Sequence, residues 1–336
     1  MSSLPYQLYG LALRTRLSLP CVLTRSPVGP DVQLVPGGAA RFARARTELA
    51  RFPQREHWFV HHRLLDGTHY VRWTGLFEFL IAADGRRILY RRLQHATPES
   101  FRVYLLGQVL SFSLLGLGIE SLHGTAVSVK GEAVVFLGDC GYGKSTLGAA
   151  LLARGCRMVT DDLVTFGECE RGWLVHPGIP RLKLFPGVAR RVLGSSRSGR
   201  QMNNGTSKLV VPLRDAEAVM RPVPLKALYV LSDPVEDRDS GSCVRIEPRA
   251  GRTAFLDVIR SAFNLLVQDR ERLANQFVFA TRLASSVPVR RLSYRRDFST
   301  LPALCDTVFA DLGALDATTL SRRQPTRLRT VLTPDG

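Results

Sequence analysis

The composition of this 336-residue chain limits what it can be. An apolar content of 45% allows one large or two moderate cores, which excludes disordered and fibrous proteins. The six cysteines include no CxxC pair and stand at no metal-ligand spacing with histidine, which argues against a zinc site or disulfide framework and favours a reducing compartment. No signal peptide is predicted from the beginning MSSLPYQLYG, so a cytoplasmic location is expected.

The net charge of +17 is mostly arginine, because only five of the 46 basic residues are lysines. No helix-turn-helix, zinc-finger or basic-aromatic pattern accompanies this charge, so a nucleic-acid partner is not expected. Local charge is more informative. Residues 171–214 contain nine basic residues and no carboxylate, which indicates that an anion binds nearby.

Residues 1–120 are predicted to form a small β-rich module. The runs LYGLALRTRLSL, HWFVHHRLL and THYVRWTGLFEFLIAADGRRILYRRL, with turns at Asp66-Gly67 and Asp84-Gly85, are typical of hairpins. The uncharged stretch 103–119 is slightly short for a bilayer and carries Gln108, two serines and three glycines. It is therefore predicted to be a buried helix, and no membrane partner is expected.

A second part, residues 121–316, is predicted to be an α/β domain. TAVSV and AVVFL flank Lys130-Gly131 and should pair antiparallel, which places His123 opposite the end of the second strand. A glycine-rich loop, a helix from Lys144 to Ala153 and the strand CRMVTDDLVTF follow, and this strand is expected to lie parallel beside AVVFL, the strand that precedes the loop. Further on, ALYVLSD should be a buried strand, followed by two helices and a last strand at VPVRRLSY. A basic, disordered tail is expected over 317–336.

The loop Gly138-x4-Gly143-Lys144-Ser145 matches the phosphate-binding P-loop pattern. Glycines let backbone N–H groups turn toward phosphate oxygens, the lysine reaches the β- and γ-phosphates, and the serine hydroxyl ligates Mg²⁺. An ordinary glycine loop with a surface lysine is the alternative. The predicted cofactors are ATP and Mg²⁺, and the predicted nucleotide-binding residues are Gly138, Asp139, Cys140, Gly141, Tyr142, Gly143, Lys144, Ser145 and Thr146.

Two neighbouring carboxylates, Asp161 and Asp162, follow the helix. They could simply cap a turn. If their strand lies beside the P-loop strand, both reach the γ-phosphate, where Mg²⁺ needs an oxygen ligand and a substrate hydroxyl needs a proton acceptor. Neighbours in a strand point to opposite faces, so the two residues could divide these roles.

The segment LHGTAVSVKGEAVVFLGDCGYGKSTLGAALLARGCRMVTDDLVTF resembles the nucleotide-binding core of HPr kinase/phosphorylase and its relatives. The resemblance implies a P-loop core with a mixed sheet. It also implies that Asp162, assisted by His123, deprotonates a target serine, and that Asp161 acts with Ser145 in holding the metal. With Lys144, the predicted catalytic residues are then Asp162 and His123. Relatives of this kind tend to form oligomers, so a homo-oligomer is an open expectation.

Weaker similarity to HPr kinase-related proteins found near peptide-modifying gene clusters extends through PGIPRLKLF and VPVRRLSY. This resemblance implies a kinase that tailors ribosomally made peptides such as lasso precursors. Thr146 stands where the bifunctional enzymes carry an acidic residue, and their second signature, with its metal-binding glutamate, is absent. Phosphorylase activity and HPr as the substrate are therefore left open. Arg181, Lys183 and Lys208 are candidate clamps for phosphate or an acidic substrate, or else ordinary solvated charges.

The resulting hypothesis is an ATP-dependent kinase that phosphorylates a Ser/Thr hydroxyl of a peptide or protein. The β-rich module would recognise the substrate, and the Gly/Ser/Asn-rich loop 194–207 would act as a lid or bind the acceptor. A small-molecule hydroxyl kinase is one alternative. The other is a nucleotide-dependent switch or ATPase with Asp233 in a Walker-B-like role, although Pro234 favours a turn at that aspartate.

Overall fold

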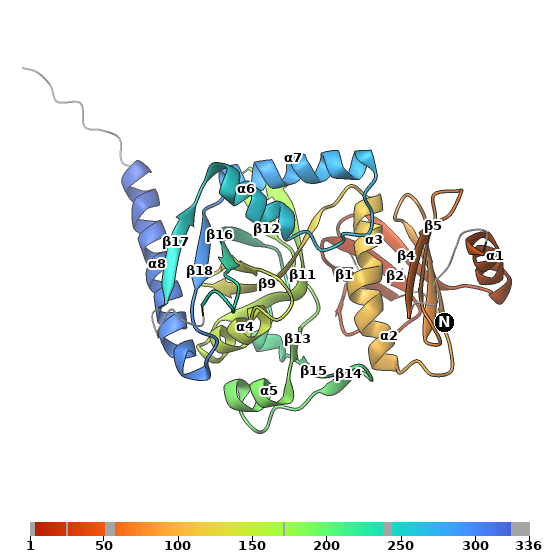
Figure 1. The fold of residues 1–336 in the computed structure, drawn as a ribbon, viewed down its shortest axis with the longest axis horizontal. Helices are drawn as coiled ribbons and strands as arrows, with labels where there is room; N and C mark the ends of the chain where they lie inside the picture. The colour runs from red at the N-terminus through yellow and green to blue at the C-terminus, as the bar shows by residue number, and fades with distance from the viewer. Residues whose placement is uncertain (1–3, 25, 51–57, 171, 238–243, 324–336) are drawn as a thin grey trace, which may run out of the picture.

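Two large sheets divide the chain close to residue 120 (Figure 1). The computed structural model describes residues 4–24, 26–50, 58–170, 172–237 and 244–323. The first sheet has eight strands in the order β3-β1-β2-β4-β8-β7-β6-β5. Its strands are β1 (Leu4–Leu8), β2 (Leu11–Thr15), β3 (Val22–Leu23), β4 (Asp31–Pro36), β5 (Phe59–Arg63), β6 (His69–Trp73), β7 (Phe77–Ile81) and β8 (Arg87–Arg92).

The expected hairpins are present in this first sheet. β1 pairs antiparallel with β2, and β5, β6, β7 and β8 pair antiparallel in sequence, with the turns at Asp66-Gly67 and Asp84-Gly85. Side chains alternate between the two faces, so each face needs a cover. Helix α1 (Ala39–Leu49), which was not predicted, packs Phe42 and Leu49 on one face. The other face carries the larger cluster that contains Phe79, Ile81 and Phe101.

The predicted buried helix covers that second face. It consists of α2 (Pro98–Tyr104), a π-helical segment η1 (Leu105–Val109) and α3 (Leu110–Gly116). Thr97 begins it, because its Oγ1 accepts a hydrogen bond from Ser100 N at 3.1 Å. Leu105, Leu106 and Val109 are fully buried. The sequence-based expectation of a core helix rather than a membrane span is therefore confirmed for this segment.

The second large sheet belongs to the P-loop core and has the order β10-β9-β11-β12-β16-β18-β17. A further parallel pairing of β10 with β16 closes five of the strands into a ring. The predicted hairpin of β9 and β10 is confirmed, with Lys130 and Gly131 at φ +51° and +87° in its turn. The strands are β9 (Ser121–Val129), β10 (Glu132–Leu137), β11 (Arg157–Cys169), β12 (Gly172–Val175), β16 (Val223–Leu231), β17 (Arg245–Arg249) and β18 (Val289–Ser293).

One predicted neighbour relation is wrong. β11 does not lie beside β10, because the hairpin partner β9 occupies that edge and the other edge of β10 pairs with β16. β9 is antiparallel to both β10 and β11, so β11 still runs in the direction of β10, one strand farther away. Its aspartates therefore still reach the P-loop end of the sheet.

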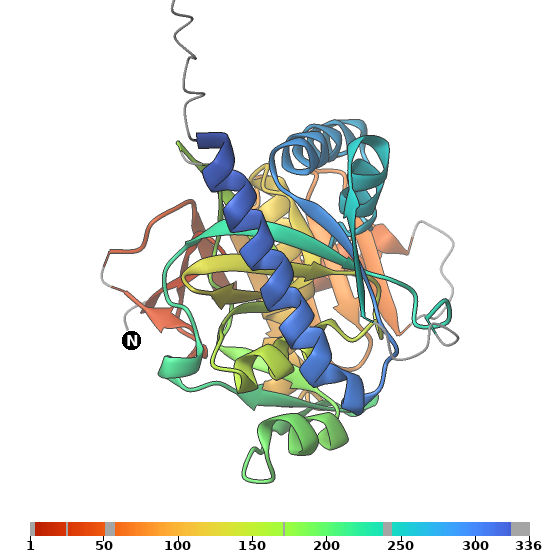
Figure 2. The same ribbon diagram turned by 90° about the vertical axis from the view of Figure 1, so that its left-hand side faces the viewer.

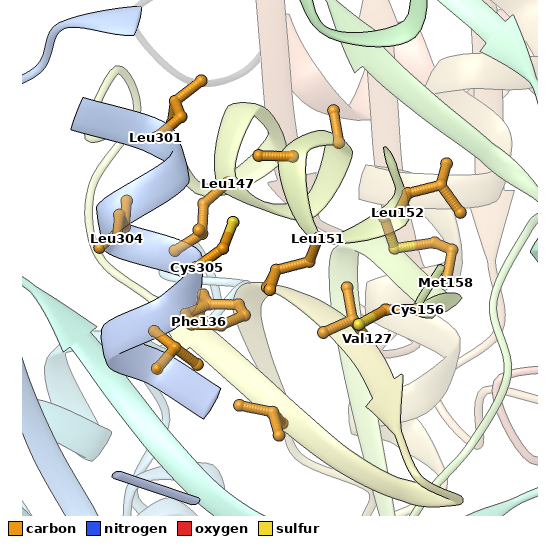
Figure 3. Close-up of a cluster of buried hydrophobic side chains, with 14 of the residues drawn as sticks. Val127, Phe136, Leu147, Leu151, Leu152, Cys156, Met158, Leu301, Leu304 and Cys305 are labelled. Atoms are coloured by element: carbon orange, nitrogen blue, oxygen red, sulfur yellow. The ribbon is translucent and has the colours of Figure 1, made fainter. Parts of the chain in front are cut away.

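Helices α4 (Lys144–Ala153) and α8 (Leu301–Arg323) pack together over this sheet (Figure 3). Leu147 and Leu151 of α4 meet Leu304 and Cys305 of α8 in one buried cluster, and Figure 2 shows α8 crossing the face of the core. The segment Phe298–Ala317 is long and apolar enough to cross a membrane by length and composition, and one side of it packs in this buried cluster.

The C-terminal expectations are partly met. The two predicted helices are α6 (Gly251–Arg260) and α7 (Arg270–Ser286), and the last predicted strand is β18. α8 was not predicted, and it continues to Arg323, so the first residues of the expected disordered tail are helical. The rest of that tail, 324–336, lies outside the described residues.

A small third sheet lies below the P-loop core in Figure 1. Its order is β13-β15-β14, with β13 (Arg181–Leu184), β14 (Arg200–Asn203) and β15 (Thr206–Pro212). Helix α5 (Pro186–Leu193) follows β13, and the single-turn helices η2 (Asp215–Glu217) and η3 (Phe298–Thr300) connect other elements. The stretch 194–207, expected as a loop, therefore contains β14 and the turn of a hairpin.

Candidate functional site

The glycine-rich loop joins the end of β10 to the start of α4. Gly138, Gly141 and Gly143 have φ values of +140°, +91° and +94°, which side-chain-bearing residues rarely adopt. Gly143 is the residue before α4, and a Cβ atom there would lie only 2.9 Å from the Tyr294 hydroxyl. The sequence thus presents the N-terminal N–H groups of a ten-residue helix to a compact loop, an arrangement that favours an anion.

A pocket of about 180 Å³ opens in front of this loop. It combines loop residues, both aspartates, His123 and a lysine-bearing edge of the small sheet. Gly138, Asp139 and Tyr142 belong to the loop but do not line the pocket. The lining residues are His123, Cys140, Gly141, Gly143, Lys144, Ser145, Thr146, Asp161, Asp162, Lys183, Leu184, Phe185 and Lys208.

Lys144 is folded back onto its own loop. Its Nζ donates hydrogen bonds to the carbonyl oxygens of Gly138, at 2.6 Å, and of Asp139, at 2.9 Å. Its side chain is 7% exposed, and burial lowers the pKa of the ammonium against the opposing effect of the two aspartates. The charge is therefore held at the base of the pocket, where a phosphate chain would lie.

Asp161 is the better connected of the two aspartates. Its Oδ1 accepts hydrogen bonds from Ser145 Oγ at 2.8 Å and Thr125 Oγ1 at 2.7 Å, and its Oδ2 accepts one from the Lys183 backbone N–H at 2.9 Å. Thr125 was not identified from the sequence. It faces Asp161 directly in the β9–β11 register, so only the correct strand order could have revealed it.

Asp162 reaches the same pocket through an unusual backbone conformation. Its φ of +86° is rare for a residue with a side chain and costs about 1–3 kcal/mol, which the surrounding structure must offset. The expectation that strand alternation alone would separate the two aspartates is therefore wrong, because both carboxylates line one pocket. A strained residue of this kind is typical of functional sites.

Three groups surround the Asp162 carboxylate. Lys183 Nζ lies 2.5 Å from its Oδ2, and His123 Nε2 lies 3.6 Å from its Oδ1. Burial opposes ionisation, but the positive charge of Lys183 and the His123 ring together hold the pKa of Asp162 well below its usual range. On the third side lies Gly107 of η1, where an added Cβ would come to ordinary van der Waals distance, 3.6 Å, from Oδ2.

The three basic residues predicted as clamps separate into two groups. Lys183 and Lys208 line the pocket. Arg181, the first residue of β13, does not line it and is only 5% exposed. Burial raises the pKa of Cys21, in the N-terminal module, to about 12, and the positive charge of Arg181 opposes this rise. The same charge opposes the rise in the pKa of Tyr9. A phosphate-clamp role for Arg181 is therefore a wrong prediction.

A second pocket of about 180 Å³, not identified from the sequence, begins on the other side of the loop. It shares Gly141, Gly143 and Thr146 with the first pocket and continues over Tyr294, Arg296 and Phe298. The Arg296 guanidinium lies 3.9 Å from the Tyr294 ring centroid, and its Nε donates a hydrogen bond to the Tyr142 carbonyl oxygen at 3.1 Å. Flat, polar-edged surfaces of this kind suit a nucleobase.

Asp233 stands outside both pockets. It follows β16, which is the parallel neighbour of β10, so its general location suits a Walker-B residue. Its Oδ1, however, accepts a hydrogen bond from Val235 N at 2.8 Å, which is the geometry of a turn. The alternative interpretation as a turn residue thus agrees with the structure.

The comparisons with known proteins point to one family. Residues 118–181 match the model of the HPr Serine kinase C-terminal domain. The curated HPr kinase/phosphorylases of Burkholderia lata and Burkholderia cenocepacia are each 30% identical over 206 residues, covering 54% of this chain. The chain spans about 60% of the length of these relatives.

One solved structure shows a weaker likeness. The HPr(Ser) kinase/phosphatase from Coxiella burnetii aligns with a TM-score of 0.34 and 13% identity, over 60% of this chain and 96% of that one. The family match includes His123, the whole P-loop and both aspartates, which is most of the first pocket.

Proposed function

We propose that this chain, which is HPr kinase-like in its P-loop core, is an ATP-dependent kinase that phosphorylates a Ser/Thr hydroxyl of a peptide or protein. The observation that carries the proposal is Asp162. It is a carboxylate kept ionised in a strained conformation, in one small pocket with Lys144 and Lys183. An ionised carboxylate that faces a phosphate site is the group that accepts the proton of an attacking hydroxyl.

The nucleotide fits across the two pockets that share the glycine loop. The phosphate chain would lie in the first pocket, against the loop N–H groups and Lys144, and the base would lie toward Tyr294 and Arg296. Ser145 and Asp161 fit Mg²⁺, because their oxygens lie 2.8 Å apart and this ion takes few protein ligands beside phosphate and water. When bound, the ion neutralises charge on the phosphates.

The residues of the chain then divide the work of the transfer. The acceptor oxygen bonds to the γ-phosphorus while the bond to the departing ADP oxygen breaks, and the hydroxyl proton passes to Asp162. Lys183 forms an ion pair with Asp162 in the structure. This pair must break when the acceptor hydroxyl binds, and the lysine ammonium can then contact the transferring phosphate. His123, 3.6 Å from Asp162, would orient the carboxylate or the hydroxyl.

The two rival functions have less support. A nucleotide-dependent switch would need Asp233 at the phosphates, but Asp233 lines neither pocket. A small-molecule hydroxyl kinase would use the same first pocket, and it differs from the proposed peptide or protein kinase only in its acceptor. The cytoplasmic location and a homo-oligomeric state agree with the family resemblance and remain part of this proposal.

The decisive experiment incubates the full chain with Mg-ATP and a panel of peptides and proteins encoded near its gene, and searches for a mass gain of one phosphate. ATP consumption should depend on the acceptor, and Lys144→Ala should abolish it while the protein remains folded. Hydrolysis of ATP at the same rate without any acceptor would instead support a switch, and phosphorylation of small hydroxyl compounds alone would support the first rival.

A further inference from the structure

A groove of about 400 Å³ separates the N-terminal module from the β14–β15 hairpin, and the reaction proposed above does not use it. Its apolar wall comes from four residues on different parts of the chain, namely Trp58, Leu76, Tyr104 and Met202. Trp58 is 66% exposed although tryptophan is usually well buried. No carboxylate lines the groove among the described residues. We call it the Trp58–Met202 groove.

The walls of this groove are fixed by specific contacts. Asn203 Nδ2 donates a hydrogen bond to the Tyr104 hydroxyl at 2.9 Å, which fastens the hairpin to α2. Figure 1 shows the β14–β15 hairpin extending toward α2. The Tyr104 ring in turn packs on Trp73 with a centroid distance of 4.6 Å, and Gly205 N donates to Asn203 Oδ1 at 2.8 Å within the turn. The groove is therefore preformed, which lowers the entropic cost of binding.

Two elements run from the groove to the phosphate pocket, although the groove and the pocket share no lining residue among those that the structure describes. Gly107, three residues after Tyr104, lies beside the Asp162 carboxylate, since a Cβ added to it would be 3.6 Å from Oδ2. Thr206 lines the groove, and Lys208, two residues later in β15, lines the phosphate pocket. Because a helix rises about 1.5 Å and a strand about 3.3 Å per residue, the groove begins roughly 5–7 Å from the wall of the phosphate pocket.

This spacing favours an extended polypeptide as the occupant. A chain that rises about 3.3 Å per residue can place its hydroxyl at Asp162 and a side chain two to four residues away in the groove. β14 is also an edge strand of its small sheet, and an edge can pair with the backbone of an added strand. A small hydroxyl compound confined to the phosphate pocket would not reach Trp58.

We propose that the Trp58–Met202 groove binds a bulky apolar side chain, preferably aromatic, of the acceptor polypeptide, close in sequence to the hydroxyl that is phosphorylated. The proposal rests on the proposed kinase function for the chemistry at Asp162. It adds a specificity site at which residues of the N-terminal module and of the β14–β15 hairpin together bind the acceptor. Aromatic contacts with Trp58 and Tyr104 would supply the affinity.

The test uses fluorescein-labelled nonapeptides with a central serine in an alanine/asparagine background and one phenylalanine moved through each other position. A matched set carries alanine in place of the serine, so that it binds without being phosphorylated. Binding is measured by fluorescence polarisation with the full chain and Mg-ADP. Phosphate transfer to the serine set is measured separately with Mg-ATP.

Peptides with phenylalanine two to four residues from the central position should bind wild type most tightly, in both sets. Met202→Asp and Trp58→Ala should weaken this binding about tenfold, whereas Trp58→Phe should retain most of it. Val278→Asp, on the exposed surface of α7, is the matched control and should bind as wild type does.

The outcomes separate the groove from the reaction. Binding by wild type that ignores the phenylalanine, no binding of any peptide, or equal loss in Met202→Asp and Val278→Asp would overturn the groove proposal. Peptides that bind in the groove as expected but gain no phosphate would leave the groove established and contradict the proposed function of peptide phosphorylation.

Discussion

The strained backbone of Asp162 explains how one pocket receives two adjacent carboxylates. In a regular strand, Asp161 and Asp162 would face opposite sides of the sheet. The φ of +86° turns Asp162 so that it meets Lys183, while Asp161 keeps its bonds to Ser145 and Thr125. One carboxylate is thereby held beside Ser145, where we propose that the metal binds, and the other lies where the proposed acceptor would approach.

Asp162→Asn should lower the rate of phosphate transfer by about 10² to 10⁴ with little change in ATP affinity, because the amide cannot accept the proton. Asparagine tolerates positive φ better than most residues, so the fold should be retained. Asp161→Asn should instead weaken the use of Mg-ATP and be partly relieved by higher magnesium. Steady-state kinetics with varied ATP and magnesium separate the two.

His123→Ala should cost less than Asp162→Asn, and the double variant should be scarcely slower than Asp162→Asn alone, because groups that act as one unit are not additive. The measurement is kcat for the two single variants and the double variant. Multiplying effects would show that His123 and Asp162 act independently and that the histidine is structural.

The ion pair with Lys183 predicts the pH dependence of the reaction. A carboxyl whose pKa is depressed in the folded state stays ionised as the pH falls through the ordinary aspartate range. Its contribution to stability is likewise present above the unfolded-state pKa and is lost only as the pH falls through the lower folded-state pKa. The wild-type profile of kcat/KM should therefore show no acid limb from Asp162 above about pH 4.

Lys183→Met should raise the pKa of Asp162, because burial opposes ionisation and the compensating positive charge of Lys183 would be gone. The acid limb of the kcat/KM profile should then move up into the measured pH range. A profile measured between pH 4 and 9 tests this, with Lys208→Met as the matched control because Lys208 lines the pocket and its Nζ lies over the Phe185 ring. Identical profiles for wild type and Lys183→Met would contradict the assignment of Asp162 as the proton acceptor.

Motifs and spacing identified most of the phosphate pocket from the sequence, because the P-loop and the two aspartates lie within one short segment. Thr125 and the Tyr294–Phe298 wall could not be found in this way, since they reach the loop only through strand pairing and tertiary packing. Arg181 was misassigned for a similar reason. Charge alone does not reveal that an arginine is buried near the N-terminal module instead of facing the pocket.

At the scale of elements, the short antiparallel strands were predictable from alternation and turn residues, whereas the order of strands in the core was not. The sequence of β9, β10 and β11 leaves open which strand β11 joins. α8 has apolar residues at helical spacing, namely Leu301, Leu304, Cys305 and Val308, so the sequence does contain the periodic pattern of a helix there. In α1, arginines and alanines obscure the pattern, because its buried side consists of Phe42, Ala45 and Leu49 and only two of these are large.

The packing of α4 on β9 gives an element-scale prediction. A Cβ atom on Gly148 would lie 2.7 Å from Thr125 Cγ2, and Thr125 also holds Asp161. Gly148→Ala should therefore destabilise the protein by about 1–3 kcal/mol through overpacking and should also weaken the use of Mg-ATP. Urea unfolding and ATP kinetics provide the two measurements.

Gly313→Ala is the matched control for that substitution. Gly313 also lies inside a helix, α8, but an added Cβ there meets nothing within 4 Å. This change should stabilise the protein by about 0.5–1 kcal/mol, because alanine loses less conformational entropy than glycine in a helix. If the two substitutions changed the free energy of unfolding by similar amounts, close packing against Thr125 would not be what excludes a larger side chain at residue 148.

At the scale of the whole molecule, the N-terminal module and the P-loop core share one buried boundary. Leu163 and Ile179 of the core belong to the main hydrophobic cluster of the module. Tyr9, 2% exposed, fastens the boundary from the other side, because its N–H donates to the Pro177 carbonyl oxygen and its carbonyl accepts from Thr165 Oγ1. Separation of the two parts would expose these surfaces, so we expect them to unfold together.

Tyr9→Ala keeps these two backbone hydrogen bonds but removes the buried ring from the cluster that contains Leu163 and Ile179. It should lower the free energy of unfolding of the entire chain by about 3 kcal/mol, as expected for loss of a buried aromatic ring. Calorimetry should show one cooperative transition for wild type, displaced to lower temperature in the variant. Leu4→Ala, in the strand β1 that precedes Tyr9 but 36% exposed, should move the transition little. Two wild-type transitions, with only one displaced by Tyr9→Ala, would show that the module is an independent domain. The strained site at Asp162, which lies beside Gly107 of the module, would then have to be held by the core alone.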